Sequence, residues 1–313
     1  MQARFVSGRL TPVWLFTASL LLWVVRVVAD AFLGAEMTFA GYFVPLLLSL
    51  LCYVAATVIL DVSFLFERRV RWLSAMFMWL AAVSSSVCGV GQEALAVLFL
   101  AIVVYRLFAC KLGDEAFYGL FSVFVTVGCA SLILPQFILL LPLFIVYSLL
   151  STRGGIRGFL AISLGFSLPY LLIYGVDTLF PGVVPWKLMG EGLVCLRALS
   201  LRMPVWYQGV LVLLQLLVLV PFVVIFMNSA VPGKPFLRRR LAFLIYLNVA
   251  LLLLSLLYND NFPSYYMMSL PTAAVMVGYI FTIKVSKPMN WFFIVVNILW
   301  FSLFPFGLCL KFL

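Results

Sequence analysis

Residues 206–258 read WYQGVLVLLQLLVLVPFVVIFMNSAVPGKPFLRRRLAFLIYLNVALLLLSLLY, and this stretch decides the fold class. Two apolar runs, near 206–227 and 241–258, flank a short segment that holds Lys234 and the three arginines 238–240. An apolar run of about 20 residues is long enough to cross a bilayer as an α-helix. The stretch therefore predicts two membrane-spanning helices joined by a basic loop.

Apolar runs of this kind continue along the whole chain. Of its 313 residues, 66% are hydrophobic and only 10% are charged, which leaves too little polar surface to coat a soluble globule of this size. We therefore expect an all-α, polytopic integral membrane protein that forms a single helical transmembrane domain over residues 1–313. About eleven transmembrane helices are expected, near 11–29, 39–60, 72–88, 94–109, 116–134, 136–150, 158–176, 206–227, 241–258, 265–283 and 290–310.

The Lys and Arg residues fall mostly on one side of the membrane when the loops between these spans are assigned alternately to its two sides. Fifteen of the twenty lie on the side of the amino terminus: Arg4, Arg9, Arg68, Arg69, Arg71, Arg106, Lys111, Arg153, Arg157, Lys234, Arg238, Arg239, Arg240, Lys284 and Lys287. The other side holds Arg26, Lys187, Arg197, Arg202 and Lys311. Short cytoplasmic loops are enriched in Lys and Arg, so we expect a cytoplasmic amino terminus and a carboxyl terminus outside.

Charge, histidine and cysteine content exclude several classes of function. The formal net charge of +10 suggests nucleic acid, but the cations lie in short loops where anionic lipid headgroups attract them, so we expect no nucleic-acid partner. The chain has no histidine, which excludes the usual histidine bases and histidine-ligated metals. Its six cysteines show no CxxC spacing, and we expect neither a metal site nor a cofactor.

The longest expected outer segment, about 177–205, differs from the other loops. If residues 186–202 are helical, charged side chains gather on one face and leucine and methionine lie mostly opposite. The charged residues are Lys187, Glu191, Arg197 and Arg202. We expect an amphipathic helix that lies on the outer leaflet, and the alternative is a plain surface loop.

Acidic residues gather on the expected outer side, which makes that side the place to look for a functional site. Six of the ten acids lie there: Asp30, Glu36, Glu93, Asp177, Glu191 and Asp260. Ionisable groups at membrane depth are costly, and are therefore candidates for function. Arg26 and Asp30 share a helix face because they are four residues apart. Two interpretations stay open: the pair belongs to a site, or Arg26 extends to the interface and pairs with Asp30 for structure alone.

Three amide side chains are expected near the middle of the membrane. They are Gln215, Asn248 and Asn297. Amides at this depth either bond across helices or line a polar path. We expect interhelical hydrogen bonds.

The segment 119–177 resembles the central helices of the GT-C membrane glycosyltransferases. It reads GLFSVFVTVGCASLILPQFILLLPLFIVYSLLSTRGGIRGFLAISLGFSLPYLLIYGVD. The similar features are a Gly-rich span, a break, a Leu-rich span with proline, a basic turn and a span with Gly before Pro-Tyr: Gly128, Pro135, Pro142, Arg153, Arg157, Gly165, Pro169 and Tyr170. The stretch 262–271, FPSYYMMSLP, is similar to a late family motif in which Tyr precedes a proline-containing span.

Taken whole, the chain more closely resembles an uncharacterised family of Bacteroidota inner-membrane proteins with about eleven spans. This resemblance implies a multi-pass protein of the bacterial inner membrane and carries no activity. The chain departs from the GT-C pattern in a short first outer loop, about 30–38, in Ile133-Leu134-Pro135 where a basic turn is usual, and in the missing His before the late Tyr.

The GT-C resemblance implies transfer of a sugar from a polyprenyl-phosphate donor on the outer side of the membrane, during envelope glycan assembly. In that chemistry Asp30 deprotonates the acceptor hydroxyl, and Glu36 and Glu93 orient the acceptor. The residues expected to bind substrate are Arg26, Lys187, Arg197, Arg202, Asp260, Tyr265 and Tyr266, with the cations on the phosphate and the aromatic rings against sugar or lipid.

Two other classes of function remain open. The first is a non-catalytic membrane subunit or scaffold that binds protein partners in an envelope-assembly complex. The second is a transporter or flippase for a lipid or amphiphile, which the lack of an internal repeat and of mid-membrane charge disfavours. In all three cases the chain is surrounded by membrane lipids.

The expected orientation can be tested with a single cysteine. Gly233→Cys, in a chain without its native cysteines, should not react with a membrane-impermeant thiol reagent in intact cells, because loop 228–240 is expected to be cytoplasmic. The same cysteine should react after the membrane is permeabilised. Pro185→Cys, in the expected outer segment, is the positive control. Labelling at 233 in intact cells would reverse the orientation.

Overall fold

The computed structural model describes residues 11–32, 50–52, 54–56, 59, 71–88, 92–110, 116–152, 155–180, 205–228, 235–283 and 287–312. Every regular element within these ranges is helical, as the composition predicts. The expected interfacial helix at 186–202 and most of the expected span 39–60 lie outside the described residues.

Three of the described helices are long and apolar enough to cross a membrane. They are α8 (Gly155–Leu179), α10 (Trp206–Asn228) and α11 (Pro235–Leu257). With 25, 23 and 23 residues, they are roughly 35 to 38 Å long at 1.5 Å per residue, which exceeds the hydrocarbon core of a bilayer. The length and apolar composition of these three helices are compatible with a membrane protein.

The chain divides into two compact units. Unit 1 comprises Met1–Leu98 and Arg202–Leu313, and unit 2 comprises Phe99–Leu201. The boundary falls within α5 (Gln92–Ala109), which begins in unit 1 and ends in unit 2. The expectation of a single domain over 1–313 stays a prediction.

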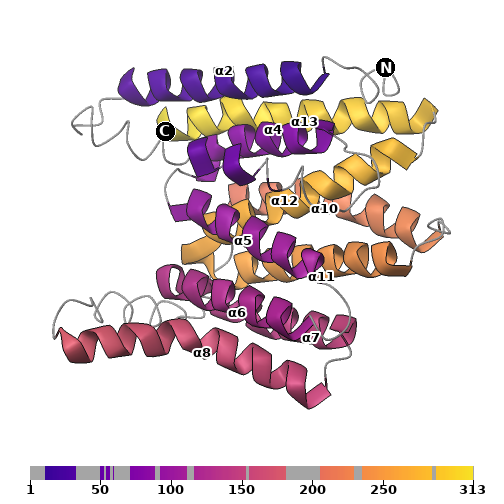
Figure 1. Cartoon of the computed structure of the whole chain (residues 1–313). Coiled ribbons are helices and arrows are strands. Elements are labelled where there is room, and N and C mark those ends of the chain that lie inside the picture. The colour runs from indigo at the N-terminus through magenta and orange to yellow at the C-terminus, as the bar shows by residue number, and fades with distance from the viewer. Residues whose placement is uncertain are drawn as a thin grey trace. The chain divides into compact units, whose positions relative to one another are not determined.

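Unit 1 is organised around two central helices, α4 and α12, which pack against each other. The other helices of unit 1 surround this pair: α2 and α13 pack on α4, and α10 and α11 pack on α12 (Figure 1). Small buried side chains such as Ala81, Ala82, Ala273 and Ala274 let neighbouring backbones approach closely. Besides α10 and α11, the elements are α2 (Thr11–Phe32), α4 (Arg71–Cys88), η2 (Asn259–Asn261), α12 (Phe262–Ile283) and α13 (Lys287–Phe312).

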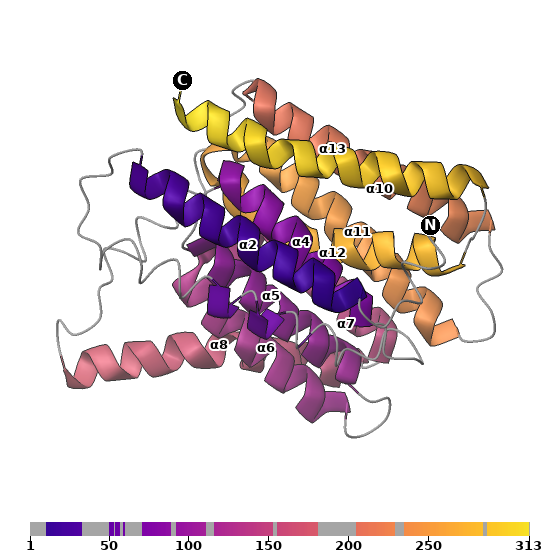
Figure 2. The same cartoon turned by 90° about the horizontal axis from the view of Figure 1, so that it is seen from above.

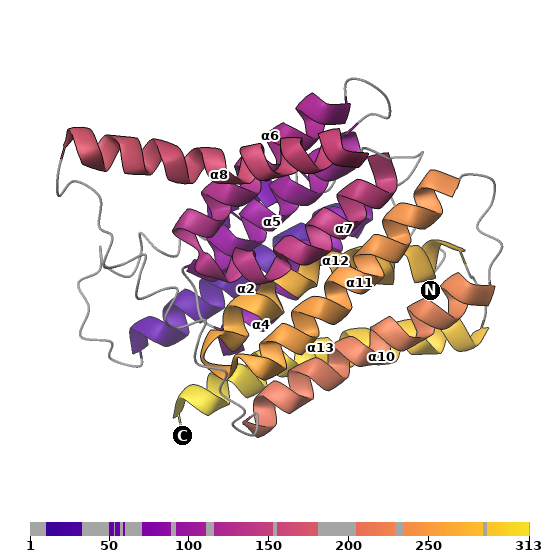
Figure 3. The same cartoon turned by 90° about the horizontal axis from the view of Figure 1, so that it is seen from below.

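Unit 2 consists of the second half of α5 followed by α6 (Ala116–Ile133), η1 (Pro135–Leu140), α7 (Leu141–Thr152) and α8. Its main contact joins α6 and α8, which run parallel and side by side (Figure 3). Near the carboxyl-terminal end of α6, the hydroxyl oxygen of Ser131 lies 2.8 Å from that of Tyr170 on α8. Beyond Tyr170 the last part of α8 continues past the end of α6 (Figure 2), and its apolar side chains are largely exposed.

Two glycines allow α6 and α8 to approach each other. A Cβ added at Gly165 of α8 would lie 2.6 Å from the carbonyl oxygen of Phe121 on α6. A Cβ added at Gly128 of α6 would lie 2.8 Å from the carbonyl oxygen of Phe166 on α8. Each helix therefore places backbone where the other has no side chain, which is the small-residue packing common between membrane helices.

The expected span 136–150 is not one α-helix, and this prediction needs correction. The segment begins as the 3-10 helix η1 and continues as the short helix α7. The reason is Pro142, which has no N–H to donate to the Ile138 carbonyl as a continuous α-helix requires. The N–H of Leu141 bonds to Ile138 instead, an i to i−3 bond that makes this turn 3-10.

The expected basic loop 228–240 also differs in part. Helix α11 begins at Pro235, so the arginines 238–240 lie in its first two turns rather than in a loop. Proline suits this position, because the first residues of a helix have no intrahelical partner for their N–H groups. Arg238 contacts the Phe226 ring of α10, with 5.9 Å between its guanidinium carbon and the ring centre.

The α6–α8 contact yields a prediction with an internal control. Gly165→Ala should destabilise the protein by roughly 1–3 kcal/mol, because the new methyl group meets the Phe121 backbone and the helices must separate. Gly175→Ala, on the same helix, should be neutral or slightly stabilising, since nothing lies within 4 Å of its added Cβ. Thermal unfolding in detergent measures both. Equal effects of the two changes would contradict the close packing.

Candidate functional site

One end of unit 1 gathers several residues that the sequence predicts to be functional. The carboxyl-terminal ends of α2 and α13 lie at the same end of the unit as the start of α12 (Figures 1 and 2). Arg26 and Asp30 belong to the last two turns of α2, and Asp260 lies in η2, directly before α12. The fold thus brings these positions to one end of unit 1, which the sequence predicts to be outside.

Arg26, at this end of unit 1, is buried, with 3% of its surface exposed. Its guanidinium carbon lies 5.8 Å from the centre of the Trp23 ring, one turn earlier in α2, within the range of a cation–π contact. It shares the buried face of α2 with Ser19 and Leu22, and α2 packs on α4. An arginine that only extends from a helix end keeps its head in water, and Arg26 does not. A buried ionised group of this kind is a candidate for function.

Several of the predicted site residues cannot be placed. Glu36, Lys187, Arg197 and Arg202 lie outside the described residues. The backbone of Asp30 belongs to α2, but its side chain lies outside them too. The roles expected for these five residues stay predictions.

The two other predicted acids are accessible. Glu93 lies in the first turn of α5 and is partly exposed. A carboxylate there is stabilised by the backbone N–H groups and the dipole of the helix start. Asp260 is exposed in η2. Both carboxylates are therefore open to a bound molecule.

Tyr265 and Tyr266 are fully buried, whereas the sequence interpretation placed their rings against sugar or lipid. The Tyr266 ring stacks on Phe262 with 5.6 Å between centres, and the Tyr265 ring lies 6.2 Å from that of Tyr258. Among the described residues the Tyr265 hydroxyl has no hydrogen-bond partner. A buried hydroxyl without a partner is costly, so Tyr265 offers an unmet hydrogen bond at this end of unit 1.

A buried hydrogen-bond network joins α10, α11 and α12 further inside unit 1. Gln215 Nε2 donates to the Ser269 hydroxyl oxygen at 2.7 Å, and Asn248 Nδ2 donates to Thr272 Oγ1 at 2.7 Å. Both amides also donate to the Ser269 carbonyl oxygen, each at 3.2 Å. The prediction that Gln215 and Asn248 bond across helices is confirmed.

The sequence reasoning missed the partners of these amides. Ser269 and Thr272 are three residues apart in α12 and so lie on one helix face. The Thr272 hydroxyl donates to the Ser269 carbonyl at 2.6 Å, and the Ser269 hydroxyl donates to the Tyr266 carbonyl at 2.5 Å. A Ser and a Thr at this spacing within an apolar span are the signal that could have identified them.

Comparison of the chain with protein-family models, with curated proteins and with solved structures gave no match. The likeness to GT-C enzymes rests on the sequence motifs described above.

Arg26 and Asp30 should be energetically coupled, because residues four apart on a helix are neighbours on one face. Arg26→Ala and Asp30→Ala, made singly and together, should give a coupling of roughly 0.5–3 kcal/mol in detergent thermal stability. Arg26→Ala combined with Arg157→Ala of unit 2 is the control pair and should be additive. Strict additivity of the first pair would show that the two side chains never meet.

Proposed function

We propose that this chain is a multi-pass protein of the bacterial inner membrane that transfers a sugar from a polyprenyl-phosphate donor at its outer face. The proposal includes about eleven spans with the amino terminus in the cytoplasm. The observation that carries it is the burial of Arg26, one turn before Asp30, at the end of unit 1 where Asp260 also lies.

Arg26 supplies the binding step of this reaction. The guanidinium presents several N–H donors in a planar fork, and phosphate oxygens match that fork. Burial strengthens the attraction because water competes less. Lys187, Arg197 and Arg202 add charge from the segment that the sequence predicts to lie on the outer leaflet.

Asp30 supplies the base. It accepts the proton of the acceptor hydroxyl as the acceptor oxygen bonds to the anomeric carbon of the sugar. The bond between that carbon and the phosphate oxygen breaks, and polyprenyl phosphate leaves with the electron pair. Glu36 and Glu93 hold the acceptor, and Asp260 contributes hydrogen bonds to the sugar.

A non-catalytic membrane subunit is the second candidate, and one observation favours it. Tyr265 and Tyr266 lie within the helix packing of unit 1 instead of presenting their rings at its surface. A packed bundle of this kind serves a scaffold as well as an enzyme.

Sugar transfer by the purified protein in lipid vesicles tests the proposal. Asp30→Asn keeps the size and polarity of the side chain but loses its basicity, so turnover should fall by roughly 100-fold while donor binding persists. Arg26→Gln should instead raise KM for the donor. Arg157→Gln, which removes an exposed arginine from unit 2, is the matched control and should leave both constants unchanged.

Two results would contradict the proposal. Wild-type protein that binds no polyprenyl phosphate and consumes no donor would leave the scaffold as the better function. Wild-type turnover by Asp30→Asn would remove Asp30 from the chemistry.

A further inference from the structure

Unit 2 holds an arginine whose guanidinium is fixed by hydroxyl groups. Arg106, in the last turn of α5, donates from Nη1 to the hydroxyl oxygens of Ser122 at 2.7 Å and Thr126 at 3.1 Å, both on α6. A longer bond of 3.4 Å reaches the Ser122 carbonyl. The Thr126 hydroxyl in turn donates to that carbonyl at 2.9 Å. These bonds hold the planar group in one orientation across the α5–α6 hairpin.

The fixed guanidinium keeps much of its bonding capacity. All of its hydrogen bonds to the described residues leave from Nη1, so Nε and Nη2 are not used by them. The partners are hydroxyl and carbonyl oxygens, and no described carboxylate pairs with Arg106. Its side chain is nevertheless exposed. A preoriented cation with open donors is suited to a phosphate, which accepts two parallel N–H bonds.

The Arg106 guanidinium lies beside α6 rather than beyond the amino-terminal end of that helix. Ser122 and Thr126 are six and ten residues after the start of α6 at Ala116, which is roughly 9 and 15 Å along the helix axis. Tyr118, one turn before Ser122, is 82% exposed, and exposed tyrosines mark the headgroup level of a membrane. The oxygens that hold Arg106 therefore lie roughly 6 and 12 Å further along α6 than Tyr118, within the length of the helix, where a cation without an anion is costly.

The exposed face of α6 continues as an apolar stripe. Cys129 lies three residues after Thr126, and Ile133 lies four residues after Cys129, so they share its face, and both are exposed. A molecule bound at Arg106 thus meets a fixed cation at one end and apolar side chains along the next two turns. This is the pattern of an amphiphile with a phosphate head and an acyl chain.

We propose that Arg106, oriented by Ser122 and Thr126, binds the phosphate of an anionic bilayer lipid, whose acyl chain lies along Cys129 and Ile133. The site rests on the membrane placement proposed above but not on sugar transfer. It belongs to the side that the positive-inside rule assigns to the cytoplasm, where anionic headgroups attract basic residues.

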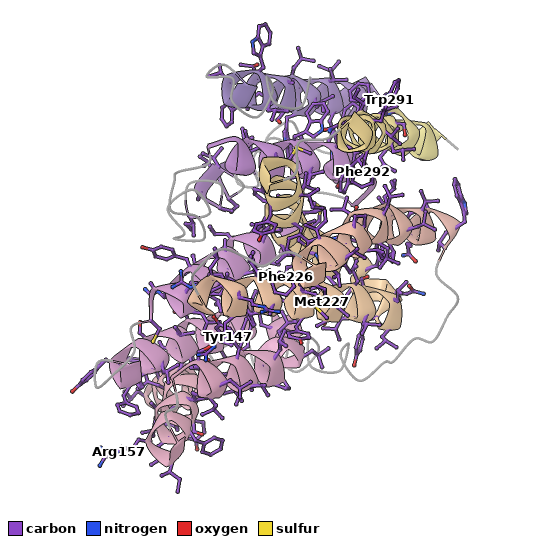
Figure 4. The ribbon with its side chains drawn as sticks, turned by 90° about the vertical axis from the view of Figure 1, so that its right-hand side faces the viewer. Tyr147, Arg157, Phe226, Met227, Trp291 and Phe292 are labelled. Atoms are coloured by element: carbon purple, nitrogen blue, oxygen red, sulfur yellow. The ribbon has the colours of Figure 1, made fainter. Side chains whose placement is uncertain are left out.

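Arg157 provides the matched control within the same unit. It is exposed in the first turn of α8 and points away from the ribbon (Figure 4). No hydroxyl of the described residues bonds to it. Arg157→Gln and Arg106→Gln remove the same charge, so they separate a built site from general attraction between basic residues and anionic lipid.

The experiment measures lipid binding by purified protein in detergent. Phosphatidylglycerol, phosphatidylcholine with the same acyl chains, or inorganic phosphate is added, and both the melting temperature and the lipid retained after washing are recorded. Phosphatidylglycerol should stabilise the wild type more than the other two. Arg106→Gln should weaken its binding roughly tenfold or more, whereas Arg157→Gln should keep it.

A further pair of variants guards against misfolding. Ser122→Ala with Thr126→Ala keeps the charge but releases the guanidinium, and Arg106→Lys keeps the charge but loses the fork. Both should reduce the preference for phosphatidylglycerol while melting normally in phosphatidylcholine. Equal losses in Arg106→Gln and Arg157→Gln, or equal stabilisation by inorganic phosphate, would overturn the lipid site. The lipid-binding test does not depend on sugar transfer, so a protein that consumes none of the sugar donors could still give this result.

Discussion

The hydrogen bonds centred on Ser269 are the interaction on which unit 1 depends. Lipid offers no water to a polar group, so an amide inside the membrane must find its partner in the protein. One serine gives Gln215 of α10 a hydroxyl and a carbonyl, and the same carbonyl receives Asn248 of α11. Apolar packing between membrane helices is only weakly directional, whereas these bonds fix which residues face one another. They set the register of α10 and α11 against α12.

In unit 2 a different physical interaction fixes how the helices pack. Its principal pair, α6 and α8, meets through Gly128 and Gly165, where side chains are absent and backbone carbonyls approach the other helix. Dispersion forces over a close, flat contact then replace the polar contacts of unit 1. A hydroxyl contact, Ser131 with Tyr170, accompanies this packing.

Sequence reasoning succeeded where one residue type has one physical outcome. Apolar length predicted α10 and α11, and an amide in an apolar run predicted an interhelical bond at Gln215. It failed where the outcome depends on a partner far away in the chain. The burial of Tyr265 and Tyr266 follows from the helices that pack around α12, and nothing in the local stretch distinguishes them from interfacial tyrosines. The partners of Arg106 could not be predicted for the same reason, because nothing in the local sequence distinguishes Ser122 and Thr126 from other helix residues.

Because α6 and α8 run parallel, the chain between them must return from one end of the unit to the other, and only residues 135–152 are available for this. As 18 residues of ordinary α-helix they would cover roughly 27 Å. A 3-10 helix rises about 2.0 Å per residue, so the six residues of η1 cover roughly 12 Å and the twelve of α7 roughly 18 Å. The sum is roughly 30 Å, whereas the 18-residue α6 that the segment runs back along is roughly 27 Å long. The proline-induced change of helix type thus lengthens the return segment by roughly 3 Å relative to an α-helix of the same 18 residues.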